Sequence, residues 1–111
     1  MQTFSPSPVP NQVFPVRAGG RNYRLSLRYF RGLAYASLSE AYGEVLSGSV
    51  RCADRAWILP WGELPGGGNI RFEDGEGKYP SYARFGTKCF LVYYSADEIA
   101  ELAGGRTNGV V

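Results

Sequence analysis

The stretch Tyr23–Phe30 alternates apolar and polar side chains with a period of two. Successive side chains of a β-strand point to opposite faces of the sheet, so this period is typical of a strand. One set of alternate positions is apolar: Tyr23, Leu25, Leu27 and Tyr29. The other set contains both arginines: Arg24, Ser26, Arg28 and Phe30. The sequence therefore predicts a half-buried strand whose arginine-bearing side faces outwards.

Glycine and proline divide the rest of the chain into short segments. The 111 residues include fifteen glycines and seven prolines, which favour turns, and 14% of the residues are aromatic, which suits packed sheets. Between the turns we expect short strands at 12–16, 21–30, 33–40, 44–50, 69–72 and 87–94, with a short strand and a bend at 57–61. The pattern predicts a mainly β fold, a small antiparallel β-barrel or sandwich.

One short helix is predicted near the C-terminus. Ser95 and Glu98 have the spacing of a capping box, in which each side chain bonds the backbone N–H of the other residue. Ile99 and Leu102 give the helix an apolar edge, and the glycine pair at 104–105 is expected to end it. The sequence therefore predicts that this helix closes the β domain.

The length of the chain fits a single domain. Residues 1–11 hold three prolines at alternate positions, a pattern that favours an extended and solvated backbone. We therefore predict a Pro-rich extended arm over 1–11, a single β domain over 12–103 and a flexible tail over 104–111.

The formal net charge is only +2, but the charges are unevenly distributed. Residues 1–55 carry seven arginines against three acidic residues, whereas residues 56–111 carry five cations against seven acidic residues. Ten of the twelve cations are arginine, the cation that is favoured where a charge must pair in a fixed geometry or stack at an interface. The basic half therefore favours a contact with protein or nucleic acid.

Several kinds of chemistry lack the residues that they need. The chain has no histidine, which removes His-based catalytic triads and metal sites that require imidazole. Cys52 and Cys89 are the only thiols, and we interpret them as reduced thiols inside a core. Gly75–Tyr79 has part of a phosphate-loop pattern, but it lacks the first glycine and the Ser or Thr after the lysine. We expect no enzyme activity and no cofactor.

Three carboxylates lie close together in the sequence, at Glu73, Asp74 and Glu76. Hard cations such as Ca²⁺ bind carboxylate oxygens, but the spacing of an EF-hand loop is absent. We interpret the cluster as an acidic turn and predict no metal site.

The candidate partner-binding residues lie on and beside the outward side of the alternating strand. They are Arg21, Arg24, Arg28, Phe30 and Arg31. Arginines beside a stacking ring suit single-stranded nucleic acid. Arginines on an outer strand face also prevent sheet-to-sheet aggregation, and cations at an interface orient a protein neighbour. The residues alone leave these three interpretations open.

Three segments together resemble a family of small bacteriophage tail proteins. They are YRLSLRYF at 23–30, AYASLSEAYGEVLSGSV at 34–50 and FGTKCFLVYY at 85–94. Over about residues 13–94 the chain is similar to the baseplate plug domain of certain contractile-tailed phages, although its loop before Phe85 is longer. The resemblance implies a structural part near the centre of the tail baseplate that joins hub and tube in a symmetric ring, and it supplies no catalytic residues.

The leading hypothesis is therefore a non-enzymatic virion component that packs against other baseplate or tail proteins, including hub and tube, and forms a homo-oligomeric ring in the assembled tail. The alternative is a β-barrel that binds single-stranded nucleic acid through the Arg and aromatic side chains of the strand. We expect synthesis in the host cytoplasm and no membrane partner, because the longest apolar run, Cys89–Tyr94, is too short to cross a bilayer and the N-terminus lacks signal-peptide features.

Overall fold

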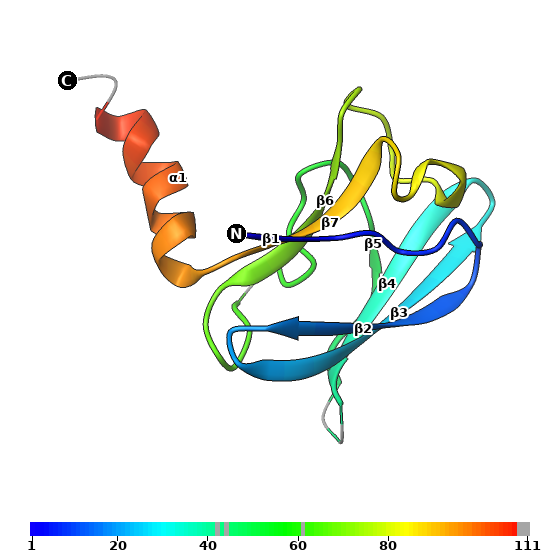
Figure 1. The fold of residues 1–111 in the computed structure, drawn as a ribbon, viewed down its shortest axis with the longest axis horizontal. Coiled ribbons are helices and arrows are strands. Elements are labelled where there is room, and N and C mark those ends of the chain that lie inside the picture. Colours follow the sequence, from blue (N-terminus) through cyan, green and yellow to red (C-terminus); the bar gives the residue numbers. More distant parts are fainter. Residues whose placement is uncertain (42, 44, 61, 109–111) are drawn as a thin grey trace.

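The computed structural model describes residues 1–41, 43, 45–60 and 62–108, and its strands form two antiparallel sheets (Figure 1). One sheet has three strands in the order β1 (Gln2–Phe4), β7 (Cys89–Tyr94) and β6 (Asn69–Asp74). The other has four strands in chain order: β2 (Gln12–Ala18), β3 (Arg21–Phe30), β4 (Leu33–Glu40) and β5 (Val45–Arg51). The sheets do not close into a barrel. The mainly β prediction is confirmed, and the fold is sandwich-like.

The alternation in the sequence of β3 matches the burial of its side chains. Tyr23, Leu25 and Leu27 are buried in the core, whereas Arg24 and Arg28 on the opposite side are exposed. β3 pairs with β2 along one edge and with β4 along the other. The two arginines therefore lie on the outward face of a four-stranded sheet, as the sequence predicted.

The core lies between the two sheets and is made mainly of aliphatic and aromatic side chains. Leu25 of β3 faces Leu38 of β4 across the strands, and Phe72 of β6 faces Leu91 of β7. All four side chains are fully buried. Burial of a Leu or Phe side chain contributes about 2 kcal/mol, so these pairs hold both sheets in place.

The two cysteines belong to this core and form no disulfide. Burial raises the pKa of the Cys52 thiol to about 12, and it raises the pKa of the Cys89 thiol to about 12 as well. Both thiols are therefore protonated near neutral pH and do not act as nucleophiles there. This agrees with the prediction of reduced thiols inside a core.

Residues 1–11 are mostly exposed, as expected for an extended arm, but Gln2–Phe4 pair with the three-stranded sheet. β1 pairs antiparallel with β7 and forms an edge of the three-stranded sheet. Phe4 contacts Phe14 edge-on, with ring centroids 6.2 Å apart, and Pro6 is buried. The alternating prolines predicted a solvated backbone, but β7 offers an edge of unpaired backbone groups that β1 satisfies.

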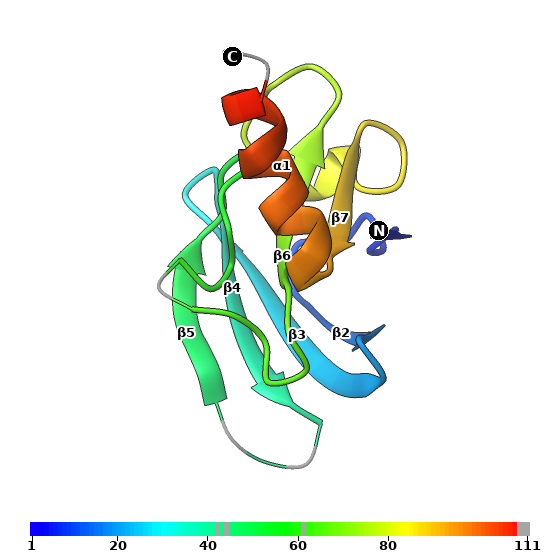
Figure 2. The same cartoon turned by 90° about the vertical axis from the view of Figure 1, so that its left-hand side faces the viewer.

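Helix α1 (Ala96–Asn108) begins at the predicted capping box and projects from the end of β7 (Figures 1 and 2). The backbone N–H of Ser95 donates to Glu98 Oε1 at 2.9 Å, and the N–H of Glu98 donates to Ser95 Oγ at 3.2 Å. The ammonium group of Met1 also pairs with Glu98 and lowers the pKa of its carboxyl. The start of the helix thus holds the N-terminus beside β7.

The end of α1 differs from the prediction. The helix passes through the glycine pair at 104–105 and ends at Asn108, so the predicted helix end at this pair is wrong, whereas the flexibility expected for 104–111 stays a prediction. Glycine in a helix costs about 1 kcal/mol relative to alanine, but it does not prevent helical backbone geometry. The remaining residues of the predicted tail, 109–111, lie outside the described residues.

The short strand predicted at 57–61 is reduced to a single β-bridge between Trp57 and Arg71. The backbone N–H of Arg55 donates to the carbonyl oxygen of Phe72 at 2.8 Å, and that of Ile58 donates to the carbonyl oxygen of Ile70 at 2.9 Å, so the segment covers the edge of β6. Pro60 has no N–H to continue the ladder, and Trp61 lies outside the described residues. The other predicted strands are present with ends shifted by at most two residues.

Candidate binding face

The outward side of the sheet β2-β3-β4-β5 carries several arginines, and we call it the arginine face. Strand alternation and register place the following residues on it: Val13, Pro15, Arg17, Asn22, Arg24, Ser26, Arg28, Phe30, Leu33, Tyr35, Ser37, Ser39, Val45, Ser49 and Arg51. None of these residues is acidic. The face is therefore cationic, although the whole chain is nearly neutral.

The strand register arranges the arginine face in rows that cross the strands. Arg28 of β3 lies opposite Tyr35 of β4, which in turn lies opposite Arg51 of β5. The next row pairs the two small residues Ser26 and Ser37. An Arg-Tyr-Arg row thus borders a row of serines.

The ion pairs of the chain separate its cations into two groups. Among the cations whose side chains the structure describes, six form ion pairs with a carboxylate: Arg21, Arg55, Arg71, Lys78, Arg84 and Lys88. The others form none within the described residues, and all of them lie on the arginine face or at the adjoining hairpin tip: Arg17, Arg24, Arg28, Arg31 and Arg51. The unneutralised positive charge of the described chain is therefore collected on one surface.

The structure brings three of the five candidate residues onto the arginine face itself. Arg24 is exposed and donates from Nη2 to the carbonyl oxygen of Ala41 at 3.1 Å. Arg28 is exposed, and the ring of Phe30 is 62% exposed. An exposed aromatic ring beside a guanidinium group is a common combination at protein interfaces.

The other two candidates, Arg31 and Arg21, lie beside the arginine face and not on it. Arg31 sits at the tip of the β3–β4 hairpin with φ of 52°, and its guanidinium lies 5.2 Å from the ring centroid of Phe30. Arg21 lies at the start of β3 and pairs with Glu40 at 3.2 Å. Arg31 therefore extends the face at the tip, whereas the charge of Arg21 is already neutralised.

Sequence reasoning missed the residues that complete the tip of the face. A hollow of about 420 Å³ is lined by Asn11, Arg28, Tyr29, Phe30, Tyr35 and Ser49. The two-residue turn between Phe30 and Leu33 fixes the pairing of Arg28 with Tyr35, so this part of the set follows from hairpin geometry. The contributions of Asn11 and Ser49 depend on the packing of neighbouring strands.

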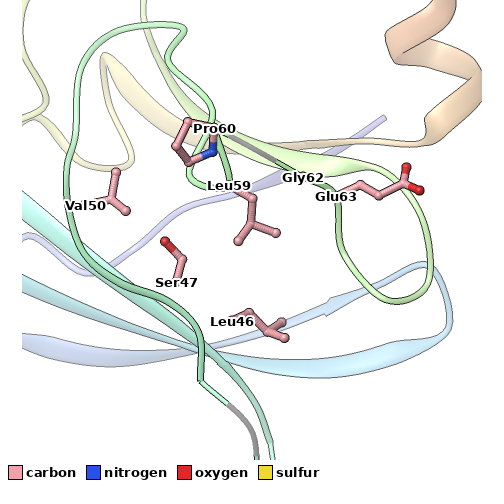
Figure 3. Close-up of a pocket in the computed structure, with 7 residues that line it drawn as sticks. All are labelled: Leu46, Ser47, Val50, Leu59, Pro60, Gly62 and Glu63. Atoms are coloured by element: carbon pink, nitrogen blue, oxygen red, sulfur yellow. The ribbon is translucent and has the colours of Figure 1, made fainter.

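A second hollow, of about 390 Å³, lies between β5 and the segment 59–63 (Figure 3). It is lined by Leu46, Ser47, Val50, Leu59, Pro60, Gly62 and Glu63. Glu63 is the only titratable residue in this lining, and the Ser47 hydroxyl donates to the carbonyl oxygen of Ile58 at 3.1 Å. The lining has no pair of acid and base groups that would assist a proton transfer.

The acidic turn is occupied by contacts within the chain. Arg84 Nε donates to Asp74 Oδ2 at 2.8 Å, and Arg84 Nη2 donates to Asp74 Oδ1 at 2.9 Å and to Glu76 Oε1 at 2.7 Å. Asp74 Oδ1 also accepts the backbone N–H of Glu76 at 2.7 Å. These bonds, led by those from Arg84, hold the pKa of the Asp74 carboxyl well below its usual range.

The third carboxylate of the cluster points to different partners. Glu73 Oε2 accepts from Arg71 Nε at 2.9 Å and from the hydroxyl of Tyr94 at 2.6 Å. The Arg71 guanidinium also lies over the ring of Trp57, 4.5 Å from its centroid. Asp74 and Glu76 therefore share Arg84 while Glu73 pairs with Arg71, and no group of metal-binding side chains is found in the described part of the chain.

The segment Phe85–Lys88 forms a tight turn that leads into β7. The ring of Phe85 stacks on Phe72 with centroids 5.3 Å apart. Gly86 has φ of +82°, which favours glycine, and its N–H donates to the carbonyl oxygen of Cys89 at 3.0 Å. This motif thus has a structural role in closing the core.

The fold and the surface define a small β-sandwich protein with one cationic outer face and a network of ion pairs around the loop between β6 and β7. The model of the family described as cyanophage baseplate Pam3 plug gp18 matches residues 1–97. The chain belongs to this family of phage baseplate plug proteins, as its resemblance in sequence implied. None of the curated proteins with which the sequence was compared matches it.

Membership in the family defines the general role of the chain. It is a structural component of the phage baseplate, it belongs to the virion tail, and its neighbours are other baseplate or tail proteins. No helix in the described ranges has both the length and the apolar character needed to cross a membrane.

Proposed function

We propose that the chain acts as a plug that joins hub to tube near the centre of the baseplate, by protein packing and without catalysing a reaction. The observation that carries this proposal is the collection, on the arginine face, of cations that pair with no carboxylate of the described residues. Cations on a rigid sheet steer a partner and fix its orientation. The side chains that would make the contact are those predicted from the sequence: Arg24, Arg28, Phe30 and Arg31, with Arg21 at the rim.

The proposal includes a homo-oligomeric ring in the assembled tail. The arginine face lies on one sheet, whereas α1 projects from the end of the other sheet (Figure 1). Two different surfaces on one subunit allow heterologous contacts, which close into a ring when the rotation between neighbours permits.

A second candidate function, binding of single-stranded nucleic acid, is supported by the proximity of Arg28 and the exposed ring of Phe30. Nucleic acid would need cations for its phosphates and rings for its bases. The double variant Arg24→Ala, Arg28→Ala, measured for tail incorporation and for oligonucleotide binding, separates the two functions.

The test is complementation of a phage that lacks this gene with the double variant Arg24→Ala, Arg28→Ala. We expect the variant to be absent from purified tails, because two of the cations that orient the partner are missing. The matched control is Lys78→Ala with Lys88→Ala, which removes two exposed cations elsewhere and should enter tails normally. Normal incorporation of the arginine variant would contradict the proposal.

The nucleic-acid arm uses a single-stranded oligonucleotide and the purified wild-type chain. We expect no binding at physiological salt. Binding that weakens with salt, with a slope that flattens in the arginine variant, would instead favour the second function.

A further inference from the structure

We infer that the tip of the β3–β4 hairpin binds an acidic segment of a neighbouring tail protein, with its carboxylates on Arg28 and Arg51 and an apolar side chain in the hollow beside Phe30 and Tyr35. This inference rests on the proposed function and names the chemistry of the partner. Its basis is the hollow lined by Asn11, Arg28, Tyr29, Phe30, Tyr35 and Ser49, together with the Arg-Tyr-Arg row that borders it.

The walls of the hollow are held by contacts within the chain. Asn11 Oδ1 accepts the backbone N–H of Tyr29 at 3.3 Å, and the ring of Tyr29 meets Tyr82 edge-on with centroids 5.0 Å apart. The backbone N–H of Ser49 donates to Ser37 Oγ at 2.9 Å. A site that is already formed loses little conformational entropy when a partner binds.

The backbone at the tip is in an unusual conformation at two positions. Arg31 and Ser49 both have φ of 52°, a region that residues other than glycine rarely adopt. Such conformations persist where the surrounding structure holds them in place. Here they place the Arg31 guanidinium over Phe30 and turn the backbone of β5 beside the hollow.

The charges at the tip favour a carboxylate ligand. Arg28, Arg31 and Arg51 have no ion pair within the described residues, and the Arg51 guanidinium lies 5.2 Å from the ring centroid of Tyr79. A guanidinium group binds a carboxylate through two parallel hydrogen bonds, which gives the contact direction as well as energy. The tip therefore offers unneutralised donors to an acidic partner.

The register of the strands predicts how the acidic groups are spaced. Arg28 and Arg51 are separated by one intervening strand, so their backbones are about 10 Å apart at the usual spacing of strands. A segment in the polyproline II conformation advances about 3.1 Å per residue with three residues per turn, so carboxylates three positions apart lie on the same side and span about the same distance. We therefore expect a segment with acidic residues at positions i and i+3.

A protein segment fits this site better than nucleic acid does. A groove for a single strand follows the backbone over several nucleotides and stacks successive bases. Of the three rings that line the hollow at the tip, only that of Phe30 is strongly exposed. The family of the chain also places its neighbours among baseplate and tail proteins.

The test places the photo-cross-linker p-benzoylphenylalanine at position 30, where it replaces one aromatic ring with another, and irradiates complete tails. Mass spectrometry then identifies the attached peptide. We expect a peptide of another tail protein with acidic residues three positions apart. The control carries the same cross-linker in place of Phe90, a residue of β7 in the other sheet, and should not yield this peptide.

The identified peptide is then synthesised and its affinity for the purified full chain is measured. Arg28→Glu should weaken binding at least tenfold, and Arg28→Lys, which keeps the charge but loses the forked geometry, should weaken it less. A cross-link to nucleic acid, to a second copy of this chain or to a segment without acidic residues would overturn the inference.

Failure of this inference and failure of the proposed function have different results. If the double arginine variant does not enter tails but the peptide attached at position 30 lacks carboxylates, the partner chemistry is wrong and the plug function stands. If the double variant enters tails normally and position 30 gives no cross-link, both are wrong.

Discussion

Arg84 and Arg28 are the same type of residue in opposite situations. Arg84 has a side chain that is only 20% exposed, and it donates three hydrogen bonds to the carboxylates of Asp74 and Glu76. Arg28 is exposed on β3 and has no ion pair within the described residues. Arg84 holds the loop between β6 and β7 together, whereas the guanidinium N–H groups of Arg28 are available to a partner.

The two regions differ in how their charges are satisfied, and the difference separates stability from binding. In the acidic turn the buried carboxylate of Asp74 needs its cation, because an unpaired charge in the interior is costly. On the arginine face each exposed cation is stabilised by water, so it contributes little to folding. A surface of this second kind can change its partner without affecting the fold.

Loss of the Asp74 charge should have the largest effect on stability. Asp74→Asn removes the ion pair from a side chain that is fully buried, and we expect the free energy of unfolding to fall by roughly 3 kcal/mol. Urea unfolding followed by circular dichroism measures the change. The matched control, Glu101→Gln, removes an exposed carboxylate and should change little. Equal stability of the two variants would remove the distinction between the regions.

Acid should reveal the same ion pair. Because hydrogen bonds from Arg84 lower the pKa of Asp74 in the folded state, its contribution is present above the unfolded-state pKa of about 3.9 and is lost as pH falls towards the lower folded value. The free energy of unfolding should therefore decrease below about pH 4. In Asp74→Asn this decrease should be smaller. Parallel pH profiles of the two proteins would show that Asp74 is not the titrating group.

The smallest effect on stability is expected on the arginine face. Arg28→Ala should change the free energy of unfolding by less than about 0.5 kcal/mol, since the side chain is exposed and no carboxylate of the described residues pairs with it. Arg84→Ala, by contrast, should unfold at a clearly lower urea concentration. A marked destabilisation by Arg28→Ala would show that the face is needed for folding.

Local patterns explain which features could be predicted from the sequence. The period of two at Tyr23–Phe30 sets the faces of β3, because alternation depends only on neighbouring residues. The capping box at Ser95 and the β3–β4 hairpin also depend on residues that are close in the chain. The alternation and the hairpin therefore predict on which side of the sheet Arg24 and Arg28 lie, without knowledge of any tertiary contact.

The features that were missed depend on contacts between distant segments. β1 pairs with β7 although most of the chain separates them, and the prolines after β1 gave no sign of this pairing. Arg84 meets Asp74 only when the loop before Phe85 folds back. The hollow at the tip needs Asn11, which directly precedes β2, and Ser49 of β5, on either side of the hairpin. Tertiary packing, not local preference, sets such contacts.

Arginine-specific labelling with phenylglyoxal, read by mass spectrometry on the free chain and on purified tails, tests the central claim most directly. The claim is that the arginine face is covered by neighbours in the assembled baseplate. We predict that Arg24 and Arg28 react in the free chain and are protected in tails, while Arg84 is protected in both. Equal reactivity of Arg28 in the free chain and in tails would contradict the account.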